Sequence, residues 1–266
     1  MSDPRRRGAR PQPQQAAAPE TPSYFDRKQD TLEGFESITQ QTMAIPFVRI
    51  LQKLSPQLDK GKPEYIEGAE EGDFFNTVTK EVMKGFKFVC LDFRQMYLEW
   101  LPDRGGFAGY HDSQNAARLA EESGTVQNFG KWKTTAGNLL QETYVYMGFV
   151  AGKESEGVVI LSFSSSMIKA AKEWNRLMTT HVMPNGEVAA PYYLVWQFGT
   201  EYRKNEKGSW YVENIKFDGY VTEPQLLQAR TERKTLPARI TSIDYKQLGS
   251  SGERGDGESL PEESKY

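Results

Sequence analysis

The sequence predicts a mainly β fold with a few helices, that is, a β-rich α+β class. Runs rich in aromatic and branched residues, the composition typical of strands, recur through the middle of the chain. Only two stretches show helical periodicity. So many strands would leave many exposed edges, and a single closed or semi-open barrel is the natural way to protect them.

The two ends of the chain differ from its middle. Residues 1–23 hold five prolines and four arginines against two acids, which predicts a disordered Pro/Arg-rich arm. Residues 247–266 have five acids against two bases and few apolar side chains, which predicts a flexible acidic tail. The body between them, residues 24–246, has 27 basic and 29 acidic residues and is expected to form one domain.

The strands are expected in the following order along the body. The first two cover residues 86–93 and 97–101, separated by a short break. Residues 144–150 and 158–163 follow. Residues 192–202 and 210–217 flank the polar stretch 203–209, which predicts a long hairpin.

Two helices are expected. The first is capped within residues 164–166 and runs to about Thr179, with Met167, Ala171, Trp174 and Met178 on one face. The second begins near Pro224 and runs to about Lys234. Residues 105–138 are expected to be loop-like, with a short Ala-rich helix near residues 115–122.

Several function classes are excluded by missing motifs. The single cysteine, Cys90, allows no internal disulfide framework and lies in an apolar run typical of a buried thiol. His111 and His181 have no Cys or His at ligand spacing, so neither a structural zinc nor any other cofactor is expected. No phosphate-binding loop is present, and the S-x-x-K match at Ser166 lacks its companion motifs. We therefore expect no enzymatic activity.

The longest apolar runs are far shorter than a membrane span, and the amino terminus has no apolar signal region. The expectation is a soluble protein without a membrane anchor. The net charge of −3 also excludes a strongly basic nucleic-acid-binding protein, although it leaves room for a local basic groove.

Basic and aromatic residues alternate in several places, a combination that binds single-stranded nucleic acid. Cations follow the phosphate backbone, while rings stack on unpaired bases at about 1–3 kcal/mol per base. The candidate DNA-binding residues are Lys131, Trp132, Lys133, Tyr97, Trp100, Lys169, Lys172, Arg176, Arg203, Lys204, Lys207, Trp210 and Tyr211. For the strand aromatics the alternative is core packing, and for the helix cations it is a solvated face.

The carboxyl terminus ends in an acidic run with an aromatic last residue, formed by Glu262, Glu263, Ser264, Lys265 and Tyr266. Such a tail can compete with DNA for a basic groove and can dock partner proteins through its apolar end. It is therefore a candidate partner-binding segment.

A larger set of segments resembles one family of phage proteins. The segments are residues 44–57, 65–69, 72–73, 76–79, 99–100, 105–107, 161–166, 168–169, 174–175 and 205–210. Together they span roughly residues 35–220, and they resemble the single-stranded DNA-binding proteins of lytic podophages. The length and the Ser-Lys-Tyr ending are most similar to the schitovirus type, from phages with a giant virion RNA polymerase.

The resemblance implies an OB-like barrel core with insertions and sequence-tolerant binding of single-stranded DNA. It also implies a role in phage DNA replication and recombination in the cytoplasm of the infected bacterium. For the schitovirus type, it further implies that the tail recruits partners and activates late transcription by the host RNA polymerase. Two alternatives remain open: a phage structural or scaffolding protein whose aromatics form an oligomer interface, and a metal-dependent nuclease using Asp/Glu pairs.

Overall fold

The computed structural model describes residues 44–102, 106–116, 119, 131–206, 208–240 and 243. The chain divides into two units, residues 1–39 and 40–266, and every described residue belongs to the second. The arm expected at residues 1–23 and the tail expected at residues 247–266 lie outside the described residues.

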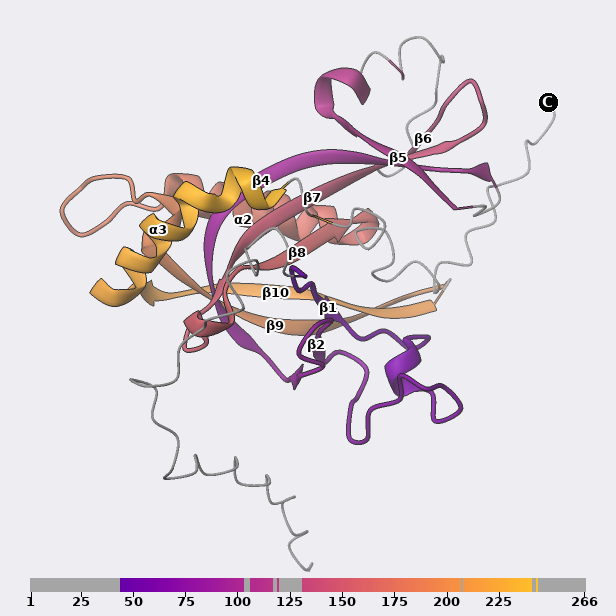
Figure 1. The fold of residues 1–266 in the computed structure, drawn as a ribbon, viewed down its shortest axis with the longest axis horizontal. Helices are drawn as coiled ribbons and strands as arrows, with labels where there is room; N and C mark the ends of the chain where they lie inside the picture. Colours follow the sequence, from indigo (N-terminus) through magenta and orange to yellow (C-terminus); the bar gives the residue numbers. More distant parts are fainter. Residues whose placement is uncertain are drawn as a thin grey trace, which may run out of the picture. The chain divides into compact units, whose positions relative to one another are not determined.

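The main sheet is antiparallel and has two long central strands, β4 (Phe86–Trp100) and β7 (Leu139–Val150). The hairpin of β9 (Leu194–Asn205) and β10 (Gly208–Tyr220) pairs with β4 through β9, and β8 (Val159–Ser164) pairs with β7. These strands dominate the fold in Figure 1. The predicted mainly β class is confirmed.

The two central strands extend past their neighbours. β9 pairs with residues 86–89 of β4, and β8 pairs with residues 143–148 of β7. Beyond these contacts β4 pairs with β5 (Phe107–Asp112), and β7 pairs with β6 (Lys131–Lys133). We call residues 92–100 of β4 together with residues 139–147 of β7 the ribbon; Figure 1 shows it leaving the body of the sheet, with β5 and β6 at its end.

A small second sheet lies at the gap between β8 and β10. It contains β1 (Val48–Ile50), β2 (Phe74–Asn76) and β3 (Val82–Met83). Phe47 forms a parallel bridge with Ile160 of β8. On the other side Gln52 makes two hydrogen bonds with the backbone of Tyr211, donating to its oxygen at 2.8 Å and accepting from its nitrogen at 3.0 Å.

The predicted OB-like barrel is therefore not closed by continuous strand pairing among the described strands. β1 is only three residues long and pairs with neither β8 nor β10 along a ladder. The small sheet instead contacts β8 through the bridge between Phe47 and Ile160, and it contacts β10 through the side chain of Gln52.

The sheet has a separate core on each face. The inner face packs against α2 (Ile168–Thr180), whose Ala171, Trp174 and Met178 are buried among side chains of β4, β7, β8 and β9. The outer face packs against α3 (Glu223–Ile240), where Ala229 and Leu236 meet residues of β4 and β7. The sheet is thus covered on both faces. In the ribbon, too, residues 140–147 of β7 and the outer-face residues Met96 and Leu98 of β4 are buried, and the exposed or half-buried side chains lie mainly on β4.

The two predicted helices are confirmed, with differences at their ends. α2 buries the predicted face, but its N-cap is Met167 and no side-chain cap bond forms. The serines before it instead form the 3-10 turn η4 (Ser165–Met167) and the end of β8. α3 continues to Ile240, past the predicted end, because Leu236 is buried against the outer face of the sheet.

Several strands differ from their predicted form. The expected break between residues 93 and 97 is absent, because residues 94–96 pair with residues 143–145 of β7. The hairpin is confirmed, but its ladder continues to Asn205 and Gly208, so the turn is tighter than predicted. The stretch expected to be loop-like contains β5 and β6. The short helix expected near residues 115–122 agrees with the helical residues 113–116 and 119, while the rest of that range lies outside the described residues. β1, β2 and β3 were not predicted.

Candidate nucleic-acid interface

A line of aromatic rings runs from the inner core onto the exposed part of the ribbon. Strand alternation places Phe93, Gln95 and Tyr97 of β4 on one face, and their partners across the ladder are Tyr146, Tyr144 and Glu142 of β7. Tyr146 belongs to the inner core, so this is the face that α2 covers farther along the sheet. We call Phe93, Tyr144, Tyr97 and Trp132 the aromatic strip.

The rings of the strip contact one another in two pairs. Phe93, which is 38% exposed, lies 5.3 Å from Tyr144 between ring centroids and 5.0 Å from the buried Tyr146. Farther along, Tyr97 lies 5.2 Å from Trp132 of β6, and both rings are half-buried. Two partly open aromatic surfaces therefore follow each other along one face, an arrangement on which successive bases can stack.

A hydrogen-bonded polar group separates the two ring pairs. Nε2 of Gln95 donates to the Tyr97 hydroxyl at 3.0 Å and to Oε1 of Glu142 at 2.7 Å. Burial, together with the nearby Glu142 carboxylate, raises the pKa of Tyr97 and raises that of Tyr144 to about 12. Both tyrosines thus keep their hydroxyl protons at physiological pH and remain hydrogen-bond donors.

The end of the ribbon is held by Glu99. Its carboxylate accepts hydrogen bonds from Nδ2 of Asn138 at 2.7 Å and contacts Nε2 of His111 on β5 at 2.7 Å. Burial alone would raise the pKa of Glu99, but the hydrogen bonds from Asn138 and His111 outweigh it, so the pKa is lowered. These contacts hold β4 to β5 and to Asn138, the residue directly before β7. They therefore fix the end of the ribbon that carries Tyr97.

The cations of α2 lie near the residue through which this helix binds the inner core. Asn175 accepts a hydrogen bond from the Tyr146 hydroxyl at 2.8 Å, which turns that flank of α2 toward the ribbon. Lys172 lies one turn before Asn175, and Arg176 follows it directly; both, like Lys169, are exposed. Lys169, Lys172 and Arg176 therefore share the exposed side of α2, next to the residue that binds Tyr146.

The remaining candidates lie elsewhere. Arg203, Lys204, Trp210 and Tyr211 belong to the β9–β10 hairpin, which joins β4 at the end opposite Tyr97. Arg203 is paired with Glu201 at 3.1 Å, and the Tyr211 ring packs against Gly72. Lys207 lies outside the described residues. The structure therefore divides the predicted site into a ribbon group and a hairpin group.

Trp100 and the β6 lysines do not join the strip. Trp100 lies on the opposite face of β4 from Tyr97, packed edge-on against Phe107 at 5.5 Å and against the outer core. Its position agrees with the core-packing alternative. Lys133 is exposed and alternates with Trp132 along β6, so it emerges on the other face; Lys131 begins the same strand, and its side chain is not among those described.

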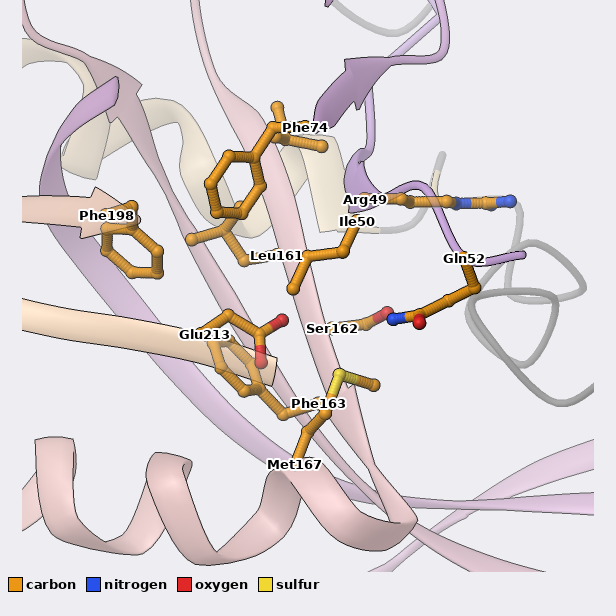
Figure 2. A pocket seen from close by; sticks show the side chains of 11 residues that line it. Arg49, Ile50, Gln52, Phe74, Leu161, Ser162, Phe163, Met167, Phe198 and Glu213 are labelled. Atoms are coloured by element: carbon orange, nitrogen blue, oxygen red, sulfur yellow. The ribbon is translucent and has the colours of Figure 1, made fainter. Parts of the chain in front are cut away.

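A small cavity lies where β1, β8 and β10 meet, and it suits no organic ligand. Its volume of about 20 Å³ holds roughly one water molecule. Figure 2 shows the Glu213 carboxylate among Phe163, Phe198 and Leu161, with the Arg49 guanidinium directed away from it. Oε2 of Glu213 has no hydrogen-bond partner in the described structure, and burial raises the pKa of this carboxyl to about 8.

The described part of the chain contains no group of three or more His, Cys, Asp or Glu side chains able to hold a metal ion. None of its helices is long and apolar enough to span a bilayer. Burial raises the pKa of the Cys90 thiol to about 12, which agrees with the predicted inert cysteine.

Comparison with known proteins places the chain in a phage family. A family model described as Pam3 phage gp34-like protein matches residues 13–236. The chain belongs to the Pam3 phage gp34-like family. As a gp34-like protein it is of bacteriophage origin, and the match includes the ribbon, the strip and α2. No curated protein and no solved structure matches it.

In this gp34-like protein, four residues of the ribbon face were missed by sequence reasoning: Phe93, Gln95, Glu142 and Tyr144. The period-two spacing of residues 93, 95 and 97 could have indicated a shared face. That signal was hidden by the break expected at residues 94–96, and the partners on β7 depend on the β4–β7 register.

Proposed function

We propose that this phage protein binds single-stranded DNA with little sequence requirement, along the aromatic strip of the ribbon. The observation behind the proposal is the two ring pairs that follow each other from the inner core onto the ribbon, together with exposed cations on α2 next to Asn175, which binds Tyr146 of the inner core. Rings supply stacking surfaces for unpaired bases, and Lys169, Lys172 and Arg176 supply charge for the phosphates. The resemblance to podophage single-strand binders supports the same function.

The charge of the protein indicates how much of the affinity for single-stranded DNA would come from phosphate contacts and how much from stacking. The chain has a net charge of −3, and carboxylates of Glu99 and Glu142 lie on the ribbon face itself. Phosphate contacts alone are therefore a weak source of affinity, and stacking should supply much of it. The affinity should fall less steeply with salt than it does for strongly basic binders.

The test is a fluorescence titration of the full chain with a mixed-sequence single strand and with a duplex of equal length. Trp132→Ala and Tyr97→Ala should each weaken single-strand binding by about 1–3 kcal/mol. Tyr220→Ala is the matched control, because Tyr220 is an exposed β10 tyrosine outside the strip. Unchanged affinity in both strip variants would remove the strip from the site, and no single-strand binding at all would refute the proposal.

We also propose, from the resemblance, that the protein acts in phage replication and recombination and that its acidic tail recruits partners, the host RNA polymerase among them for late transcription. The sequence supports this with the acidic run that ends in Tyr266. Deleting residues 253–266 should leave DNA binding intact or tighter and abolish binding to purified host polymerase. Loss of DNA binding in the deletion variant would contradict this division of roles.

A second candidate function is a structural or scaffolding role in the phage particle. It is favoured by exposed aromatic rings on β10. Phe217 and Tyr220 of β10 are 42% and 44% exposed, and both rings pack against His181. Apolar rings on an outer strand suit an interface between copies. Light scattering on nuclease-treated protein distinguishes this role, since it predicts assembly that depends on concentration without any DNA.

A further inference from the structure

We infer that the aromatic strip is a two-point clamp, in which the two ring pairs hold two bases of one strand at a fixed distance from each other. This inference rests on the proposed function and refines it. It predicts how long a single-stranded stretch must be, and how its bases must be spaced, to engage the whole strip.

The two ring pairs lie at different levels of the strand ladder. Phe93 and Tyr97 are four residues apart on β4, which is about 13 Å along an extended strand. Trp132 lies one level beyond Tyr97 on the same face, because its partner Leu140 pairs with Glu99. The second ring pair is therefore at least about 13 Å farther along the ribbon than the exposed ring of the first pair.

The level between the ring pairs carries a polar group. Gln95 lies there on the same face of β4, and across the ladder it faces Tyr144. The Tyr144 ring belongs to the first pair and is only 7% exposed, so it supports Phe93 and offers little surface of its own. The Gln95 amide is held by hydrogen bonds to Tyr97 and Glu142. Among the described side chains, a base above this level thus meets a fixed amide in place of an exposed ring.

The ladder fixes the distance between the ring pairs. β4 and β7 pair without a register shift from residue 92 to residue 100, and β6 extends the same sheet beside β7. At the outer end Glu99 adds its contacts with Asn138 and His111. A bound strand must therefore adjust its own spacing to the ribbon.

The dimensions of a single strand convert this distance into a number of nucleotides. Neighbouring bases of a stacked strand are about 3.4 Å apart, and full extension of the backbone roughly doubles this step. The bases on the two ring pairs are then roughly two to four steps apart. A single-stranded stretch of roughly three to five nucleotides is thus the shortest that engages both pairs.

The gain from the second ring pair depends on this match. Once one base has stacked, the second base is held close to its ring by the linking nucleotides, and its contribution is largest when their length fits the span. Because every base has a face that can stack, the clamp selects strands by the spacing of their bases and tolerates any sequence.

The experiment uses strands of about ten nucleotides that are abasic except for two thymines. The number of phosphates is constant, so only the separation of the two bases varies. Each strand competes with a fluorescent mixed-sequence single strand for the full wild-type chain at low salt. We expect the tightest binding when the thymines are roughly two to four steps apart, about tenfold tighter than that of a strand with one thymine. Adjacent thymines, and thymines about six or more steps apart, should gain much less.

Two variants test the assignment to the ring pairs. The double change Tyr97→Ala with Trp132→Ala removes the second pair, and Phe93→Leu replaces the exposed ring of the first pair by an aliphatic side chain. In each variant two thymines should bind about as tightly as one at every separation. Tyr220→Ala, an exposed tyrosine of β10 outside the strip, should keep the dependence on separation. A urea unfolding curve for each variant reports whether it is folded.

The outcomes distinguish failure of the clamp from failure of the proposed function. If the mixed-sequence strand binds but the separation of the two thymines has no effect on affinity, the clamp is overturned and single-strand binding stands. A dependence on separation that survives in either folded strip variant overturns the assignment to these rings. No binding of the mixed-sequence strand refutes the proposed function, and the clamp with it.

Discussion

Glu213 shows how one residue can make stability depend on pH. Its carboxyl belongs to β10 and lies in the small cavity between β1 and β8, enclosed by aromatic and aliphatic side chains (Figure 2). An ionised carboxylate without a partner is costly in such surroundings, so the proton is retained and the pKa rises from 4.5 to about 8.

The sign of the pH effect follows from the two pKa values. Between pH 4.5 and about 8 the unfolded chain has released this proton while the folded protein keeps it. Stability should therefore fall as pH rises through this window, by up to about 1.4 kcal/mol per pH unit, and Glu213→Gln should flatten the decline. Urea unfolding at a series of pH values measures this, with the exposed Glu201→Gln as control; an unchanged slope in Glu213→Gln would be the contrary result.

At the scale of elements, Gly148 allows the paired strands β4 and β7 to lie close together. A Cβ at this position would overlap the Val89 carbonyl oxygen and would lie 2.5 Å from Cζ of Phe88. Both neighbours belong to β4 just before its register shift at residues 90–92, where the ribbon begins. This position on β7 therefore has no room for a larger residue.

Gly148→Ala should accordingly destabilise the fold by about 1–3 kcal/mol or more, because the clash involves backbone and a buried ring. The free energy of unfolding in urea is the measurement. Gly109→Ala on β5 is the control, since an added Cβ there meets nothing within 4 Å. Equal stability of the two variants would show that the strands separate at little cost.

The exposed face of α2 gives a prediction about salt. Lys172 and Arg176 are exposed near Asn175, which accepts a hydrogen bond from Tyr146 of the inner core. If both contact phosphates, replacing both by Gln should reduce the slope of log affinity against log salt by about 1.4. The same double change at Arg230 and Lys234, exposed on α3 across the sheet, should leave the slope as it is. An equal effect at both helices would indicate a general charge effect only.

At the scale of the whole described unit, Gln52 joins the small sheet to the main one. Its side chain makes both hydrogen bonds that a neighbouring strand would make with Tyr211, and the Gly72 backbone packs on the Tyr211 ring. The hairpin group of aromatics and cations is thus partly a structural device for joining the two sheets.

Gln52→Ala should cost about 1–3 kcal/mol, because it leaves two backbone groups of Tyr211 without partners in a partly buried place. Amide hydrogen exchange should speed up at Tyr211 and in β1 before the rest of the main sheet is affected. Gln57→Ala in the nearby 3-10 helix η1 (Pro56–Leu58) is the control. Exchange that accelerates evenly across the protein would argue against a local opening between the sheets.

The local sequence determined much of this protein. Composition and alternation predicted the mainly β class, and helical spacing predicted the buried face of α2 with Ala171, Trp174 and Met178. The β9–β10 hairpin followed from two strand-like runs around a polar turn. These features depend on neighbours within a few residues, which a sequence displays directly.

Tertiary structure decided the candidate site. Tyr97 and Trp132 are 35 residues apart and meet only because β4 and β6 both pair with β7. The same register brings Gln95 to Glu142, places Trp100 on the opposite face, and separates the hairpin group from the ribbon. β1, β2 and β3 are too short to be recognised alone and exist because the gap between β8 and β10 stabilises them. Long-range pairing sets which side chains share a face, and no local pattern records it.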